Sequence, residues 1–315
     1  MKEISVLITV YNCENYLRDC LDSVVNQTFN KDLLEVIIVD DCSTDNSVEI
    51  CKEYTINNPN WKLIINKSNQ GCATSRNIAL KNATGNYIVI LDSDDMLYKE
   101  SLETLHDVAL KTDSDIVIAR LNAFNQNGEY GYYSDKYINK NQLTNLYKNH
   151  KLINCISVCS KLYKRELIKD LKFLENVTHE DNYFTMLALL NYEKVFTLKK
   201  PLYYRRIRDI KKDSIMQNLN YKTYADLLKN YKYVITDFQS DKKKYFLHLY
   251  MIKKASNYIV NHLKKMEINK GKQELRNFIN FLYYDNYIKK IRKNYYLVYF
   301  TIYYNIARIY KGVIG

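Results

Sequence analysis

The chain has 315 residues, of which 47% are hydrophobic and 26% are charged, and its formal net charge is +12. This length and apolar content are ample for a hydrophobic core and indicate one large domain with an additional part. The seven cysteines are odd in number and include no Cys-x-x-Cys pair, which argues against a disulfide framework or a zinc site and indicates the reduced thiols of a cytoplasmic protein.

The first 120 residues alternate between apolar strand-like runs and segments with helical apolar spacing. The apolar run at 4–10 is too short for a signal peptide and predicts a first strand at 5–10. Further strands are expected at residues 35–40, 61–65, 87–92 and 115–119. Helices are expected near residues 16–25, 48–54, 73–83 and 102–109. Because several strands are apolar throughout, the pattern predicts an α/β fold with a doubly wound, mostly parallel sheet covered by helices on both faces.

The middle third of the chain is less regular. Residues 122–150 are polar and rich in tyrosine and asparagine, and we interpret them as a long connection. A helix over 181–190 and strands near 195–198 and 202–206 are expected after it.

The excess positive charge lies in the last hundred residues. Residues 216–315 carry 19 Lys and Arg against 6 Asp and Glu, a net +13, whereas residues 1–215 carry 28 against 29, a net −1. Helical spacing prevails from residue 221 onward. We therefore predict a domain at 1–215 and a basic helical region at 216–315 whose partner is an anionic surface.

Ligands of open α/β sheets bind at the carboxyl ends of the strands. Those ends lack both Gly-x-Gly-x-x-Gly and the phosphate-binding loop Gly-x4-Gly-Lys-Ser/Thr. They carry polar and acidic residues instead, in the segments Thr9–Asn12, Asp40–Asp41, 66–71 and 92–95. Carboxylates that face an anionic nucleotide need a cation between them.

The last of these segments, Asp92-Ser93-Asp94-Asp95, closes the most apolar strand. Two carboxylates one residue apart can both face a hard ion such as Mg²⁺ or Mn²⁺. An EF-hand is excluded, because Leu97 stands where that loop needs glycine. The alternative is that Asp94 and Asp95 cap a helix beginning near residue 99.

The whole set of motifs resembles the nucleotide-binding half of inverting, non-processive family-2 glycosyltransferases of GT-A fold. The stretches that carry the resemblance are SVLITVYNCENYLRDCLDSVVNQT, EVIIVDDCSTDNS, NQGCATSRNIAL and GNYIVILDSDDML, with weaker matches at SKLYKREL, THEDNYFT and YYRRIRD. The resemblance implies that residues 1–215 bind a nucleotide sugar, most often a UDP-sugar, and transfer a hexosyl or N-acetylhexosaminyl group.

The resemblance also implies roles for individual residues. The nucleotide would contact Thr9, Tyr11, Asp40, Asn69, Arg76, Asp92 and Ser93, with Tyr11 near the uracil and Asp40 accepting from its imide N–H. Asp94 would bind the Mn²⁺ or Mg²⁺ that bridges the diphosphate. Two residues of these segments also have simpler interpretations: Arg76 could be a surface residue, and Asp41 a turn residue.

Transfer to a hydroxyl needs a general base. On the resemblance Asp181 occupies the position of that base, and Glu180 orients it. The simpler interpretation is that both residues favour a helix N-terminus through the helix dipole. Arg206 and Arg208 follow on a basic segment and are candidates for the diphosphate, since a guanidinium suits phosphate; a solvated basic loop is the alternative.

Processive members of the family carry Gln-x-x-Arg-Trp and transmembrane helices, but the only tryptophan here is Trp61 and no 18-residue apolar run occurs. This favours the addition of single sugars to a glycan or lipid-linked acceptor in bacterial surface polysaccharide synthesis. A nucleotidyltransferase would ordinarily carry a Gly-rich basic loop where TVYNCENY stands. A nucleic-acid-binding protein is a third class, but the tyrosines after residue 221 fall at helical spacings typical of a core.

The segment NYYLVYFTIYYNIA at 294–307 is uncharged and is flanked by basic residues. Fourteen residues are too few to span a hydrocarbon core of ~30 Å as a helix. Residues 285–315 could instead lie on an anionic membrane surface at the cytoplasmic face, or pack against the first domain or a second subunit as a homo-oligomer contact.

Overall fold

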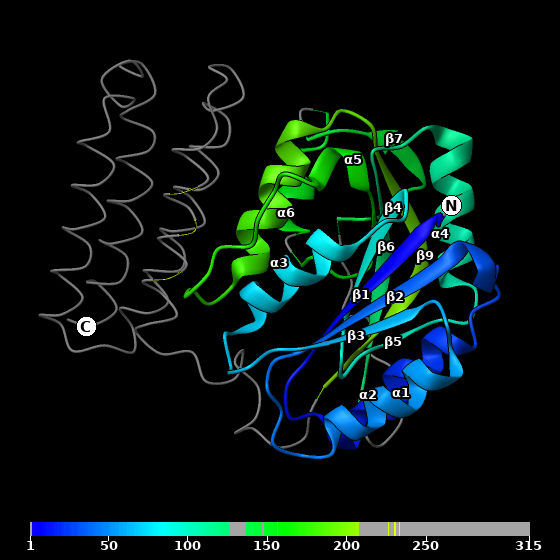
Figure 1. Cartoon of the computed structure of the whole chain (residues 1–315). Coiled ribbons are helices and arrows are strands. Elements are labelled where there is room, and N and C mark those ends of the chain that lie inside the picture. Colours follow the sequence, from blue (N-terminus) through cyan, green and yellow to red (C-terminus); the bar gives the residue numbers. More distant parts are fainter. Residues whose placement is uncertain are drawn as a thin grey trace, which may run out of the picture. The chain divides into compact units, whose positions relative to one another are not determined.

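The computed structural model describes residues 2–125, 137–146, 148–155 and 157–207, together with residues 226, 230 and 233. Backbone contacts divide the chain into two compact units, Met1–Leu219 and Asn220–Gly315. The architecture below is that of the first unit (Figure 1). Apart from three single positions, the basic helical region predicted for 216–315 lies outside the described residues and stays a prediction.

The described part of the first unit is built on a nine-stranded sheet in the order β3-β2-β1-β4-β8-β6-β9-β5, with β7 paired to β9. The strands are β1 (Ile4–Val10), β2 (Leu34–Asp40), β3 (Trp61–Ile65), β4 (Tyr87–Asp92), β5 (Met96–Leu97), β6 (Ile116–Phe124), β7 (Gln142–Thr144), β8 (Lys161–Lys164) and β9 (Val195–Arg206).

Strand direction decides which chain ends meet. β1 to β4 are parallel to one another, β8 runs antiparallel to both β4 and β6, and β9 is parallel to β6. The carboxyl ends of β4, β6 and β9 therefore lie at the same edge of the sheet. The amino end of β8 lies there too, because that strand runs the other way.

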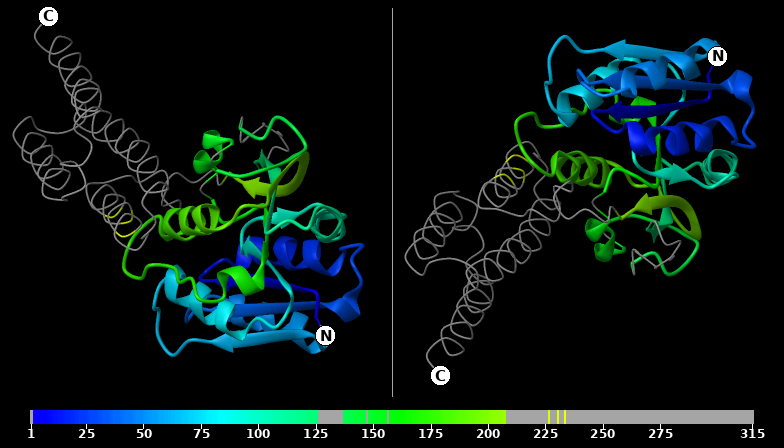
Figure 2. Two further views of the ribbon diagram at one scale, coloured as in Figure 1. Left: turned by 90° about the horizontal axis from the view of Figure 1, so that it is seen from above. Right: turned by 90° about the horizontal axis from the view of Figure 1, so that it is seen from below.

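Helices cover the two faces of the sheet. They are α1 (Glu14–Val25), α2 (Ser47–Asn57), α3 (Cys72–Asn82), α4 (Ser101–Thr112), α5 (Arg165–Ile168) and α6 (Glu180–Asn191), with 3₁₀ turns η1 (Lys31–Leu33) and η2 (His150–Asn154). α1 and α2 lie side by side on one face, and α3 crosses β1 and β2 on the other (Figures 1 and 2). This is the layering that right-handed crossovers produce when the chain runs outward from β1 to β3 and then returns to β4.

Burial explains the sequence pattern. β1 and β4 are buried along almost their whole length, because both faces are covered, and this is why they read as continuous apolar runs. α1 instead buries one stripe, made of Leu17, Cys20, Leu21 and Val24. Among the described residues, no helix combines the length and hydrophobicity that a membrane crossing needs.

The structure confirms the predicted α/β class, the first four strands and the helix over 181–190. Three expectations were wrong in detail. β6 continues to Phe124, five residues beyond the predicted end at 119. The strands predicted at 195–198 and 202–206 are one strand, β9, whose register against β6 shifts between Ala119 and Leu121. The interval 122–150, expected as a connection, contains the end of β6, β7 and the first residue of η2.

Candidate active site

The carboxylate segment forms a tight turn at the end of β4. The Asp95 N–H donates to the Asp92 carbonyl oxygen over 3.0 Å. The helix that follows, α4, begins at Ser101 with Glu100 as its N-cap residue. The interpretation of Asp94 and Asp95 as caps of that helix was therefore wrong, and the negative charge at the strand end needs another explanation.

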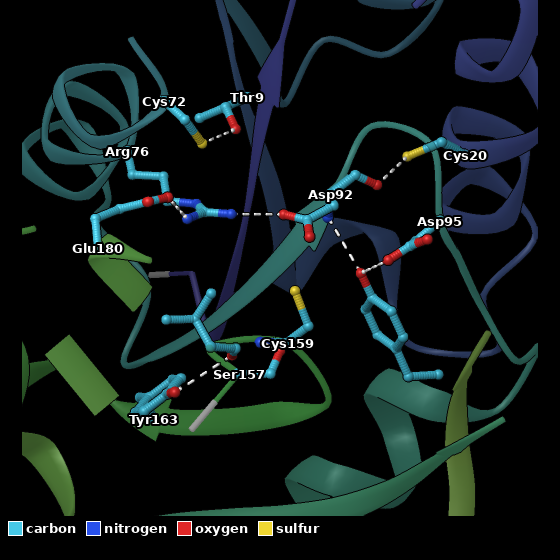
Figure 3. Close-up of polar contacts among 12 residues, drawn as sticks. Thr9, Cys20, Cys72, Arg76, Asp92, Asp95, Ser157, Cys159, Tyr163 and Glu180 are labelled. Carbon is cyan, nitrogen blue, oxygen red and sulfur yellow. Dashed lines mark hydrogen bonds and ion pairs between the residues drawn. The ribbon is translucent and has the colours of Figure 1, made fainter. Parts of the chain in front are cut away.

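Arg76 joins this turn to a distant part of the chain (Figure 3). Its Nη2 donates to Asp92 Oδ1 over 2.7 Å, and its Nη1 donates to Glu180 Oε1 over 2.5 Å. The guanidinium carbon also lies 5.5 Å from the ring centroid of Phe173. Only 8% of the Arg76 side chain is exposed, so the interpretation of Arg76 as a surface residue was wrong.

The predicted base lies beside this bridge. Glu180 and Asp181 are the first two residues of α6, so Arg76 brings the helix start to the carboxylate turn. Burial, followed by the nearby charge of Glu180, raises the pKa of Asp181 to about 7, while Arg76 acts in the opposite direction. A carboxyl group with a pKa near neutrality can both accept and release a proton at neutral pH.

The predicted base-binding residues lie at the ends of β1 and β2. Asp40 is fully buried, and its Oδ2 accepts from the Ser43 N–H over 2.9 Å. Its other carboxylate oxygen, Oδ1, has no hydrogen-bond partner among the described residues. A buried acceptor without a donor is costly, so this oxygen fits an N–H supplied by a ligand.

Tyr11 and Thr9 lie close by in the chain. Tyr11 is 49% exposed, so its ring is accessible to a ligand. The Thr9 hydroxyl shares a 3.6 Å hydrogen bond with the Cys72 thiol at the start of α3 (Figure 3). Thr9 and α3 are thus in direct contact.

Asp41 does more than the turn role expected of it. Its Oδ1 accepts from the Gln70 N–H at 2.9 Å and its Oδ2 from the Gly71 N–H at 2.7 Å. The Asn66 amide adds a third contact of 2.8 Å to Oδ1. Asp41 therefore holds the segment 66–71, on which the exposed Asn69 lies. A second aspartate directly after a buried strand was the signal that could have indicated this role.

The candidate metal ligand, Asp94, lies in the same turn as Asp92 and is partly exposed. Across the described part of the chain, no cluster of three or more His, Cys, Asp or Glu side chains forms a protein-only metal site. Two carboxylates one residue apart still fit Mg²⁺ or Mn²⁺, because such ions take only one or two carboxylates when substrate phosphates supply the remaining oxygens.

Thiols surround the carboxylate turn. The Cys20 thiol donates to the Asp92 carbonyl oxygen over 3.6 Å, and the Cys13 thiol lies near Ser93, which lowers its pKa against the larger effect of burial. Burial raises the pKa of Cys13, Cys20 and Cys159 above the usual thiol value. None of the seven cysteines, which all lie in the described residues, forms a disulfide, and these three are protonated at neutral pH.

Of the two arginines predicted to bind the diphosphate, Arg208 lies outside the described residues. Arg206 ends β9, and its guanidinium is engaged within the protein. Its Nε donates to the Asp94 carbonyl oxygen over 2.9 Å, and its Nη2 donates to Asp19 Oδ2 over 2.7 Å. Only 9% of the side chain is exposed.

Comparison with known proteins agrees with this geometry. The family model described as glycosyl transferase family 2 matches residues 5–172. Glycosyltransferase GlyA of Streptococcus pneumoniae is 38% identical over 216 residues, which cover 65% of this chain and 31% of GlyA. The poly(ribitol-phosphate) beta-N-acetylglucosaminyltransferase TarS of Staphylococcus aureus is 33% identical over 209 residues, 65% of this chain and 35% of TarS. The chain thus spans about a third of the length of these two curated relatives.

A solved structure of S. aureus TarS 1–349 in complex with UDP-GlcNAc superposes with a TM-score of 0.68 at 26% identity, over 83% of this chain and 73% of that one. The match to a Pyrobaculum calidifontis mannosyltransferase has a TM-score of 0.52 at 16% identity, covers 94% of this chain and 85% of that one, and supports the fold alone. Together with the carboxylate turn at the end of β4, these matches show that the chain belongs to glycosyltransferase family 2 and has the GT-A fold.

Proposed function

We propose that this chain is a metal-dependent, inverting glycosyltransferase. It moves one sugar from a UDP-sugar to a hydroxyl of a glycan or lipid-linked acceptor in bacterial surface polysaccharide synthesis. The observation that carries the proposal is the Arg76 bridge, which holds the strand-end carboxylate Asp92 next to the helix start that bears Asp181. A donor-binding carboxylate turn and a candidate base are thereby held in one site.

Asp181 acts as the general base. It takes the proton of the acceptor hydroxyl as that oxygen attacks the anomeric carbon of the sugar, and the bond to the diphosphate breaks on the opposite side. A single attack of this kind inverts the anomeric configuration. The pKa of about 7 supports this role. With this pKa the Asp181 carboxylate is a stronger base than an ordinary aspartate, and a large fraction of it is still ionised at neutral pH.

The nucleotide binds across the ends of β1, β2 and β4. The Asp40 oxygen that has no partner among the described residues accepts from the uracil imide N–H, and Tyr11 contacts the ring. Thr9, Asn69, Arg76, Asp92 and Ser93 complete the pocket. Uracil specificity is supported by the complex of TarS with UDP-GlcNAc, since TarS is a relative of this chain.

Asp94 binds Mn²⁺ or Mg²⁺ together with the donor. Such an ion stabilises the negative charge that develops on the departing diphosphate. Arg208 remains a candidate for an additional diphosphate contact, on the sequence alone.

The acceptor and location are proposed from the relatives and from charge. GgaB of Bacillus subtilis, 30% identical over 211 residues, is named a minor teichoic acid biosynthesis protein. We place this chain in the cytoplasm, peripherally attached to an anionic membrane surface or to a second copy through 285–315. No observation favours the nucleotidyltransferase or nucleic-acid-binding alternatives over the family match.

The test is a panel of UDP-, GDP- and TDP-sugars incubated with the full chain and Mn²⁺. Slow donor hydrolysis and product on lipid-linked or free glycan acceptors are both measured. We expect one UDP-sugar to be consumed and the product to have inverted configuration. Turnover of a nucleoside triphosphate with a sugar phosphate, and no consumption of any nucleotide sugar, would instead support a nucleotidyltransferase.

A further inference from the structure

The end of β9 contacts the carboxylate turn at four points. The Tyr203 hydroxyl accepts from the Asp92 N–H at 3.3 Å and donates to Asp95 Oδ2 at 2.7 Å. The Arg206 N–H donates to Asp95 Oδ1 at 2.7 Å, and the Arg206 Nε donates to the Asp94 carbonyl oxygen at 2.9 Å. These four bonds end on backbone atoms of Asp92 and Asp94 and on the side chain of Asp95. None of the four uses the carboxylate of Asp92 or Asp94.

The arginine that makes two of these contacts is itself fixed. Its guanidinium carbon lies 4.5 Å from the ring centroid of Phe124 on β6 and 5.1 Å from that of Tyr16 on α1. The ion pair with Asp19 adds a second contact to α1. Arg206 therefore joins three elements, β6, α1 and the turn, and a guanidinium held this way has little freedom to reach a ligand.

Asp95 completes the attachment from the turn side. It is 4% exposed, and its two carboxylate oxygens accept from Tyr203 and Arg206. Asp95, which directly follows the candidate metal ligand Asp94, is thus held in place below the protein surface. Fixing the backbone on either side of Asp94 limits the directions in which its carboxylate can point.

We propose that Tyr203 and Arg206 are positioning residues that orient the 92–95 turn so that the Asp94 carboxylate meets the divalent ion bound with the donor. Arg206 thereby acts through the turn and not on the diphosphate. This inference rests on the proposed function, because Asp94 is a metal ligand only within it. The chemical principle is that groups supporting a ligand typically change metal affinity by about 10–100-fold when they are removed.

The variants Arg206→Lys and Tyr203→Phe test the proposal in the full chain. Arg206→Lys keeps the positive charge and the backbone N–H but lacks the Nε–H that holds Asp94. Tyr203→Phe keeps the ring but removes both contacts of the hydroxyl. Arg18→Lys is the matched control, since Arg18 lies on the same helix as Asp19 and pairs with Glu53 at the surface.

Mn²⁺ binding in the presence of UDP is measured by the loss of the free-ion electron paramagnetic resonance signal, and UDP affinity is measured by calorimetry at saturating Mn²⁺. We expect the Mn²⁺ dissociation constant to rise by about 10-fold or more in both variants and not in Arg18→Lys. UDP affinity at saturating Mn²⁺ should stay within about twofold of the wild type. Circular dichroism under the same conditions identifies the folded fraction, to which the binding data are normalised.

Two results would overturn the inference while leaving the proposed function intact: unchanged Mn²⁺ affinity in both variants, or weaker UDP binding in Arg206→Lys that saturating Mn²⁺ does not restore. The second would return Arg206 to the diphosphate. Absence of any Mn²⁺-dependent UDP binding in the wild type is a different outcome. It would reject the metal role of Asp94, and with it this inference.

Discussion

Asp92 and Glu180 are hydrogen-bonded to the two ends of one guanidinium, that of Arg76, at 2.7 and 2.5 Å. One residue ends β4 and the other begins α6, so the bridge fixes the distance between the carboxylate turn and the start of α6. The Arg76 and Glu180 side chains are only 8% and 15% exposed. Removal of the arginine therefore leaves the carboxylates of Asp92 and Glu180 without the positive charge that both of them contact.

The substitution Arg76→Met tests the structural side of this relationship. We expect it to lower the free energy of unfolding by about 3 kcal/mol or more, because breaking a buried ion pair leaves uncompensated charge. Urea denaturation at neutral pH measures the change. Arg18→Met is the control: both partners of the Arg18–Glu53 pair are about half exposed, so its loss should cost less than about 1 kcal/mol. Equal effects of the two substitutions would contradict a special role for the buried bridge.

Asp181→Asn removes proton acceptance while nearly preserving shape. We expect kcat to fall by roughly 10²-fold or more with donor binding unchanged, as for the loss of a general base. A variant that retains most of its turnover would place the base elsewhere, with Glu180 the next candidate.

The pH dependence follows from the raised pKa of Asp181. The base must be deprotonated, so kcat/KM of the wild type should rise as pH increases toward the pKa of about 7 and level off above it. The stability of the fold should change with pH in the opposite direction, falling as Asp181 ionises. Because the folded pKa lies above the unfolded value, ionised Asp181 destabilises the fold at pH 8, and this cost disappears as pH falls below the unfolded pKa of about 4. Asp181→Asn should therefore unfold at higher urea than the wild type at pH 8, and the difference should shrink toward pH 4.

Asp94→Asn tests the metal ligand. We expect transfer to be abolished and UDP binding to weaken only when Mn²⁺ is present, because the lost ligand acts through the ion. Calorimetric titration of UDP with and without Mn²⁺ separates the two conditions, and removal of metal with a chelator should bring the wild type to the level of the variant. If the variant and the wild type bind UDP equally at saturating Mn²⁺, the assignment of Asp94 is wrong.

Gly85 tests the fold at the other end of β4, away from the carboxylates. A Cβ atom at this position would lie 2.7 Å from both the backbone nitrogen and the hydroxyl of Ser5 and 2.8 Å from the Ile4 carbonyl carbon. Gly85→Ala should therefore cost about 1–3 kcal/mol of stability through overpacking, with kcat of the folded fraction unchanged. Ser5→Ala added to it should not restore stability, because two of the three close atoms belong to the backbone. Restoration would show that only the hydroxyl was in the way.

Membrane attachment through 285–315 is a prediction from sequence. Co-sedimentation with liposomes that contain anionic lipid, at low and high salt, compares the full chain with a chain ending near residue 285. We expect only the full chain to bind, and less so at high salt, since screening weakens the attraction between lysines and headgroups. If both chains stay in the supernatant under all conditions, the segment is a packing or oligomerisation module.

The elements that the sequence predicts well are those determined by local patterns. β1, β2, β3 and β4 are mostly apolar runs. β2 and β4 end at an aspartate, and an asparagine follows β1 and β3 within two residues, so both their type and their ends can be predicted. β8 and β5 could not be predicted, because each is short and owes its existence to pairing with a partner far along the chain: Lys161 with Ile118, and Met96 with Tyr204. The length of β9 has the same cause, since its second half pairs with β6 on one side and with β5 on the other.

The site shows a similar division. The motifs identify which side chains are chemically suited to nucleotide and metal, but not what holds them. Arg206 illustrates the difference. As an arginine it is chemically suited to bind phosphate, but at the end of β9 its guanidinium donates to the Asp94 carbonyl oxygen. Asp41 is the same case: its contacts go to residues 29 and 30 positions later in the chain. Such long-range contacts depend on strand order, which residue types do not reveal.

The thiols beside the turn bear on how this site would tolerate chemical stress. The thiolate is the form of cysteine that reacts with oxidants and alkylating agents, and burial keeps Cys13, Cys20 and Cys159 in the neutral form. Thiolates are also the ligands by which soft ions such as Zn²⁺ would compete. Three sulfur atoms therefore lie around a turn whose candidate metal ligands are oxygens, and as neutral thiols they react more slowly with oxidants than thiolates would.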